Sequence, residues 1–163
     1  MPGLFSREKA VPLTTKLASA FALLLWVPLA MAQNNLGELL DAGAKQLTVE
    51  EFKEQVVQRM IVGPTATGAR LEVMYTANGM VQGTGGMAPS QIALAEVSGD
   101  WTMGDNGRIC TSMRIGGAGG AGGQSGVILP PRCQFWFKLA DQYYLSDSDS
   151  DRRTRVLRRT LKR

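Results

Sequence analysis

In one stretch of the chain, apolar and polar residues alternate with the period of an α-helix. Four apolar residues, spaced three or four positions apart, fall on one helical face: Val49, Phe52, Val56 and Met60. Thr48 and Glu51 form a capping box at the start, and Gly63-Pro64 ends the segment. Asn35 is a suitable cap for a shorter helix that stops at Gly43. The pattern therefore predicts one or two helices in this part of the chain.

After Gly68 the hydrophobic period falls to two, which is typical of β-strands. Leu71, Val73 and Tyr75 alternate with other residues, and Asn78-Gly79 then predicts a hairpin turn in which both residues take positive φ. Further strands, separated by turn residues, are predicted over the ranges 80–84, 91–101, 108–115, 127–129, 132–139 and 143–145. Helices followed by a run of short strands predict an α+β fold with a mostly antiparallel sheet.

The N-terminal 32 residues have the layout of a cleavable signal peptide. Basic residues precede an apolar run over residues 17–31, and small residues at Ala30 and Ala32 mark a cleavage site after Ala32. A transmembrane anchor is the alternative, but the run is shorter than the ~20 apolar residues that a span needs, and Pro28 interrupts it. No Arg-Arg pair precedes the run, so the signal is of the Sec type. The protein is therefore expected to be periplasmic or secreted, and not an integral membrane protein after cleavage.

The chain has two cysteines, Cys110 and Cys133, and both follow the signal peptide. An even number of cysteines in an exported chain is most simply paired. The loop that this pair closes has 24 residues, for which the chain-entropy model gives about 3 kcal/mol of stabilisation. The chain contains no histidine, so a catalytic cysteine would lack its usual base and a metal site would lack a common ligand. A disulfide that ties two neighbouring strands is therefore predicted.

Several short motifs with structural residues occur between residues 96 and 145: Gly99-Asp100-Trp101, Gly107-Arg108-Ile109-Cys110, Cys133 and Tyr143-Tyr144. In this order they resemble a family of small uncharacterised exported proteobacterial proteins, in which a Gly-x-Trp strand is followed by a Gly-x-x-Cys strand and a Cys-aromatic strand. The resemblance implies an exported, sheet-rich domain with paired cysteines, and it implies no activity. The glycine-rich residues 116–126 and the arginine-rich C-terminus depart from the family pattern.

The chain that follows the signal peptide has two parts that differ in net charge. Residues 33–146, the predicted exported domain, carry eight basic and ten acidic residues, whereas residues 147–163 carry seven basic and three acidic residues. The latter segment is predicted to be a Ser/Asp turn followed by a basic edge strand. Aromatic and basic residues together define a candidate binding surface: Trp136, Tyr143, Tyr144, Arg152, Arg153, Arg158 and Arg159. Its expected partner is an envelope protein or an anionic envelope component rather than nucleic acid.

Two alternatives stay open for these residues. The aromatic side chains are also suited to a buried core, and the arginines are also suited to a charged edge that keeps the protein in solution.

The acidic residues offer weak candidates for metal binding and catalysis. Asp147, Asp149 and Asp151 have the alternate spacing of a calcium loop, but arginines follow them where a calcium loop continues with glycine. A set of carboxylates is the basis of an alternative function, a small periplasmic hydrolase: Glu96, Asp100 and Asp105. On one extended strand the first two would lie about 13 Å apart. We therefore expect no cofactor, and a non-catalytic extracytoplasmic envelope protein that serves as a binding or interaction module.

Overall fold

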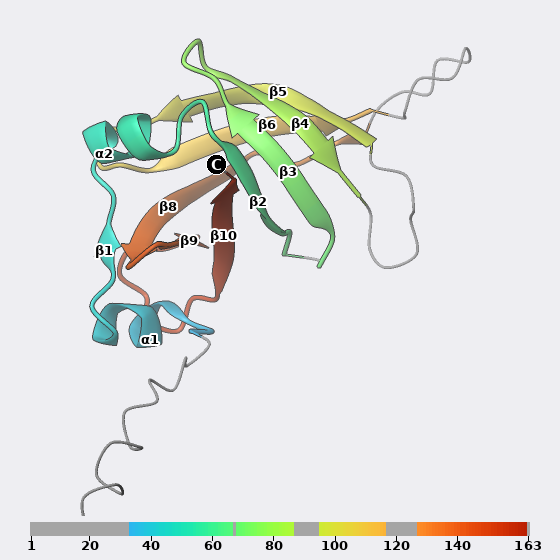
Figure 1. Ribbon diagram of the computed structural model, residues 1–163. Coiled ribbons are helices and arrows are strands. Elements are labelled where there is room, and N and C mark those ends of the chain that lie inside the picture. The colour runs from blue at the N-terminus through green and yellow to red at the C-terminus, as the bar shows by residue number, and fades with distance from the viewer. Residues whose placement is uncertain (1–32, 67, 87–94, 117–126, 163) are drawn as a thin grey trace, which may run out of the picture. The chain divides into compact units, whose positions relative to one another are not determined.

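The structure is a computed structural model that describes residues 33–66, 68–86, 95–116 and 127–162. The predicted signal peptide and its cleavage site lie outside the described residues. The described residues form two short helices and ten strands (Figure 1). In chain order these are α1 (Leu36–Asp41), β1 (Lys45–Gln46), α2 (Val49–Gln55), β2 (Met60–Pro64), β3 (Arg70–Tyr75), β4 (Met80–Gly85), β5 (Ala95–Met103), β6 (Ile109–Ile115), β7 (Val127–Ile128), β8 (Arg132–Leu139), β9 (Gln142–Ser146) and β10 (Val156–Lys162).

Eight of these strands close into a barrel. Each strand from β2 to β6, and from β8 to β10, pairs antiparallel with the next one along the chain. β10 then pairs with β2, and β6 pairs with β8, so the sheet returns to itself. The short strand β7 pairs with the end of β6, and the short strand β1 pairs with the end of β8, in each case beyond the residues that join β6 to β8. The architecture is an up-and-down barrel, a form that leaves few open strand edges.

The predicted α+β class is therefore wrong: the protein is mostly β, and the two helices are short. The main error is the length of the second helix, which ends at Gln55 instead of continuing to Gly63. Gln58 takes a φ of 63° and turns the chain, and β2 then pairs with a strand on each side. The helical spacing continues by chance as far as Met60, and hydrophobic period alone cannot locate the end of a helix.

Two hairpins confirm the predicted turn positions, and the geometry of the first differs from the expectation. At the β3–β4 turn only Gly79 has positive φ, and the backbone N–H of Gly79 donates to the carbonyl of Thr76. Gly107 repeats this arrangement with the carbonyl of Gly104 at the β5–β6 turn. Both are three-residue turns that end in a left-handed glycine; at Asn78-Gly79 a two-residue turn was expected, whereas Asp105-Asn106-Gly107 forms the predicted turn.

The core has two layers, which explains why aromatic residues occur on both faces of β8. One layer fills the barrel interior and is capped at one end by Phe52 of α2, which contacts Trp136 edge to face. The other layer lies outside the barrel, where side chains of α1 pack with Phe135 and Phe137. Leu36 and Leu39 supply the buried side of α1. The barrel is thus a packed core and not a ligand-holding cup.

The predicted disulfide is confirmed. Cys110 of β6 and Cys133 of β8 lie directly opposite each other in the strand register and are bonded, with an S–S distance of 2.06 Å. β6 and β8 pair over three residues each, which is a short contact between strands. The disulfide reinforces this contact covalently.

The C-terminal segment is a strand, as predicted, but it is not an edge strand. The first half of β10 pairs with β9 and the second half with β2. No helix in the described ranges is both long enough and apolar enough to cross a membrane.

Candidate functional site

The residues of the candidate binding surface do not lie on one surface. Trp136, Tyr143 and Tyr144 are buried, the first with 2% of its surface exposed. Trp136 and Tyr143 point into the barrel, whereas Tyr144 packs in the outer layer beneath α1. The alternative that these aromatics form core is the one that the structure supports.

Three of the four predicted arginines are exposed, and each is engaged locally. Arg152 forms an ion pair with Asp41, and Arg153 with Asp151. The Nε of Arg158 donates a hydrogen bond to the side-chain oxygen of Gln142. These contacts spread the cations over different neighbours and do not join them to an exposed aromatic side chain.

Arg159, the fourth arginine, is buried in the barrel wall. Its Nη1 donates hydrogen bonds to the carbonyls of Pro64 (2.6 Å) and Arg158 (2.9 Å). Gly63 leaves room for it, since a Cβ added there would lie 2.7 Å from the same nitrogen. The inward position of Arg159 was predictable from the sequence. Arg159 alternates with Leu157 and Leu161 and therefore shares the inward face of β10 with them.

Tyr75 is the titratable neighbour of Arg159 inside the barrel. Burial raises the pKa of the Tyr75 phenol to about 12, and the positive charge of Arg159 acts in the opposite direction. Burial lowers the pKa of Arg159 to about 10, so its guanidinium still carries its charge at neutral pH.

We expect the Tyr75 phenol to remain neutral until about pH 12 in the folded protein. The unfolded chain loses this proton near pH 10, so the contribution of Tyr75 to stability is complete below pH 10 and is lost as the pH rises toward 12. Ultraviolet titration of tyrosinate will show a late step that Tyr75→Phe lacks. Ionisation of every tyrosine near the ordinary value while the protein stays folded would contradict this.

The acidic candidates do not gather into a site. Among the described residues, no group of three Asp, Glu, Cys or His side chains is placed to hold a metal ion. Asp147 instead accepts hydrogen bonds from Gln134 and Arg132. Glu96 and Asp100 lie on the outer side of β5 with Ser98 between them, and Asp105 lies beyond the strand's end.

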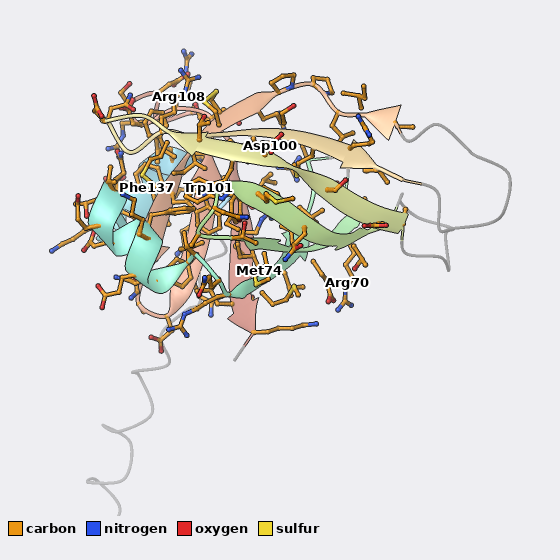
Figure 2. The ribbon with its side chains drawn as sticks, turned by 90° about the horizontal axis from the view of Figure 1, so that it is seen from above. Arg70, Met74, Asp100, Trp101, Arg108 and Phe137 are labelled. Carbon is orange, nitrogen blue, oxygen red and sulfur yellow. A yellow bond between two sulfur atoms is a disulfide. The ribbon has the colours of Figure 1, made fainter. Side chains whose placement is uncertain are left out.

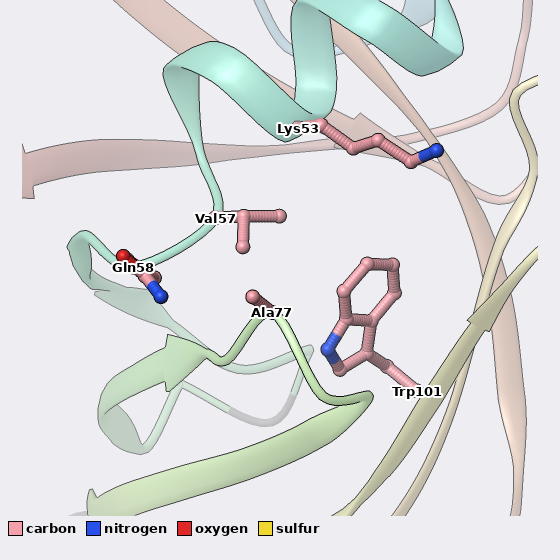
Figure 3. Close-up of a pocket in the computed structure, with 5 residues that line it drawn as sticks. All are labelled: Lys53, Val57, Gln58, Ala77 and Trp101. Atoms are coloured by element: carbon pink, nitrogen blue, oxygen red, sulfur yellow. The ribbon is translucent and has the colours of Figure 1, made fainter.

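A pocket of about 310 Å³ opens beside Trp101, at the end of the barrel that α2 covers (Figure 3). Trp101 points inward from β5, whereas the preceding Asp100 points outward (Figure 2). Its indole Nε1 donates to the carbonyl of Thr76 at 3.0 Å, and its backbone N–H donates to Gly79. The ring also meets Phe52 and Tyr75 edge to face, with centroids 5.6 and 5.8 Å away. The β3–β4 turn and the core therefore fix the orientation of this half-buried ring.

Four other residues line this Trp101 pocket: Lys53, Val57, Gln58 and Ala77. Lys53 lies on α2, and Val57 lies two residues after the last residue of that helix, Gln55. Gln58 follows with its left-handed backbone, held by a hydrogen bond from its N–H to the carbonyl of Tyr75 at 2.7 Å. Ala77 lies in the β3–β4 turn. The end of α2, the β3–β4 turn and β5 thus contribute to one concave site.

In the sequence Trp101 stands in the motif Gly99-Asp100-Trp101, outside the candidate binding surface, and its neighbours in the pocket were missed. Lys53 and Val57 are near each other in the sequence, but Val57 lies beyond the end of α2 at Gln55, so the helical period does not join them. Nothing in the sequence pattern joins them to Ala77 or Trp101, since that juxtaposition depends on how α2 caps the barrel.

A second concave region, of about 390 Å³, lies along β4–β7 on the outside of the barrel. Met80 and Ile128 line it, and both are exposed, Ile128 to 69%. Asp100 and Arg114 line it as well, so it contains charges of both signs. It lacks a fixed aromatic side chain, and the Trp101 pocket is therefore the better defined of the two sites.

Comparison with known proteins gives no relative: no family model, no curated protein and no solved structure matches this chain. The geometry of the barrel and of the Trp101 pocket is therefore the basis for inferring a function.

Proposed function

We propose that the protein is a non-catalytic binding module of the extracytoplasmic envelope, and that it takes its ligand in the Trp101 pocket. The observation that carries this proposal is the state of Trp101. Its ring is held by a hydrogen bond and by two aromatic neighbours, yet part of it remains exposed to the pocket. A preoriented aromatic side chain next to a few polar groups is the usual composition of a ligand site, because little conformational entropy is lost on binding.

The position of the acidic side chains favours binding over hydrolysis. Acid–base catalysis needs two groups that reach one substrate atom. Glu96 and Asp100 project from the outer side of β5, whereas Trp101 and its pocket face the other side. Lys53 is the single ionisable group among the five described residues that line the pocket.

The disulfide supports a location outside the cytoplasm. Cys110 and Cys133 form a bond of the kind that persists in oxidising compartments and is rare in reducing ones. The apolar N-terminal segment of residues 17–31 and the cleavage site at Ala32 supply the route of export in this proposal.

The proposal is tested by NMR on protein with ¹⁵N-labelled tryptophan. The probes are glucose, glucuronate, benzoate, benzamide, L-phenylalanine and inorganic phosphate. We expect at least one probe to shift the indole resonance of Trp101 in a saturable way and to leave that of buried Trp136 unchanged. Trp101→Phe assigns the resonance.

The control for this experiment is a pair of matched substitutions. Ala77→Phe fills the pocket, and Ala42→Phe adds the same ring at an exposed position after α1. Binding should be lost in the first variant and kept in the second. Equal binding in both variants, or no shift of Trp101 with any probe, would overturn the proposal.

A further inference from the structure

We infer that the ligand of the Trp101 pocket is a small organic anion that joins a single carboxylate to a flat apolar face. This inference rests on the proposed function and adds the chemical class of the ligand. It follows from the charge, the free hydrogen-bonding groups, the apolar surface and the volume of the pocket.

The charge of the pocket is positive. Lys53 is its one charged lining residue, and within the described part of the chain its ammonium makes no ion pair and no hydrogen bond. Glu50 lies three positions earlier on α2, within reach of the same helical side, but no ion pair joins the two. The ammonium is therefore available to an anionic group, and the exposed position lets it move toward one.

The second free polar group is the side-chain amide of Gln58. Among the described residues, the hydrogen bond of Gln58 is made by its backbone N–H, to Tyr75. The positive φ fixes the backbone at this position and brings the side chain to the pocket rim. An amide both donates and accepts, so it suits a hydroxyl group or the second oxygen of a carboxylate.

The rest of the pocket is apolar. The indole Nε1 of Trp101 already donates to Thr76, so the ring offers the ligand its carbon surface and not a donor. Val57 and Ala77 continue this surface on the opposite side. A ligand that fits must consequently place a flat apolar part between these side chains, with its polar groups turned to Lys53 and Gln58.

The volume of the pocket is suited to a small ligand. At about 310 Å³ the pocket is at the lower end of the range of small-molecule sites. Two sources share the required chemistry: an acidic sugar, which has C–H faces and a carboxylate, and an aromatic carboxylate. Both present an anion next to a flat apolar face, and they differ in their hydroxyl groups.

The test compares pairs of probes that differ in charge: glucuronate with glucose, and benzoate with benzamide. Titration of the Trp101 indole resonance gives the dissociation constant of each probe. We expect the anion of at least one pair to bind about tenfold more tightly than its neutral partner, as a charge-assisted hydrogen bond implies. The pair that shows the difference identifies the sugar or the aromatic source.

Two lysine variants test the role of Lys53. Lys53→Gln should remove the preference for the anion, whereas Lys45→Gln, an exposed lysine of β1, should leave it unchanged. Equal affinity for the anion and the neutral partner in both pairs would overturn the inference and leave the proposed binding function standing. A preference that survives in Lys53→Gln would overturn it as well. Failure of all four probes to shift Trp101 would overturn the inference, and the wider set of six probes then decides the function.

Discussion

Trp136→Ala is expected to lower the free energy of unfolding by about 3–5 kcal/mol, the range for removing a large buried aromatic side chain. Trp136 lies at the centre of the barrel interior and meets Phe52, Tyr75 and Tyr143 edge to face. Truncation leaves a cavity that the closed barrel cannot collapse to fill, because hydrogen-bonded strands hold its wall. The measurement is the midpoint and slope of urea unfolding.

Two further variants calibrate this result. Trp136→Phe keeps a ring in the same place and should lose markedly less stability. Ile128→Ala shortens a side chain that is 69% exposed and should change stability by less than about 0.5 kcal/mol. A loss for Trp136→Ala as small as that for Ile128→Ala would show that the barrel interior is not packed as described.

Gly99→Ala is expected to cost about 3 kcal/mol, at the upper end of the penalty for overpacking. Gly99 faces inward on β5, where the neighbouring strand β6 approaches closely. A Cβ at this position would overlap the carbonyl oxygen of Ser112 and lie 2.8 Å from the Cα of Met113. Both are backbone atoms, so the clash is relieved only by separating the strands. Thermal or urea unfolding measures the loss.

Gly116→Ala is the matched control, since it makes the same chemical change directly after the end of β6. Among the described residues, a Cβ there meets no atom closer than the carbonyl oxygen of Glu96 at 3.8 Å. Because alanine restricts the unfolded chain more than glycine does, this variant should be unchanged or up to about 1 kcal/mol more stable. Equal stability of the two variants would refute the close approach of β5 and β6 at Gly99.

The sequence predicts most strands and turns of this protein but not the barrel. Alternation at residues 71–75 and the glycines of the two turns are local signals, and they locate the hairpins correctly. Closure depends on the pairing of β10 with β2, which are far apart in the sequence, and no local pattern encodes it. The helical spacing as far as Met60 concealed β2 and so led to the wrong fold class.

The candidate site was misplaced for a related reason. Aromatic residues on both faces of β8 suggest one buried and one exposed face, as in a sheet with a single core. Here α1 covers the second face and makes Phe135, Phe137 and Tyr144 a second buried layer. The arrangement of helices around a barrel is a tertiary property, so neither this layer nor the Trp101 pocket was predictable from hydrophobic period.

The pairing of β10 with β2 also determines when the barrel can close during folding. Thr160 pairs with Val62, about 100 residues earlier. A chain that emerges N-terminus first presents β2 with one edge unoccupied, and every later hairpin adds to the other side of a sheet that is still open. Long-range pairing of this kind forms slowly. The barrel therefore stays open until β10 has been synthesised, and the pairing of β10 with β2 closes it.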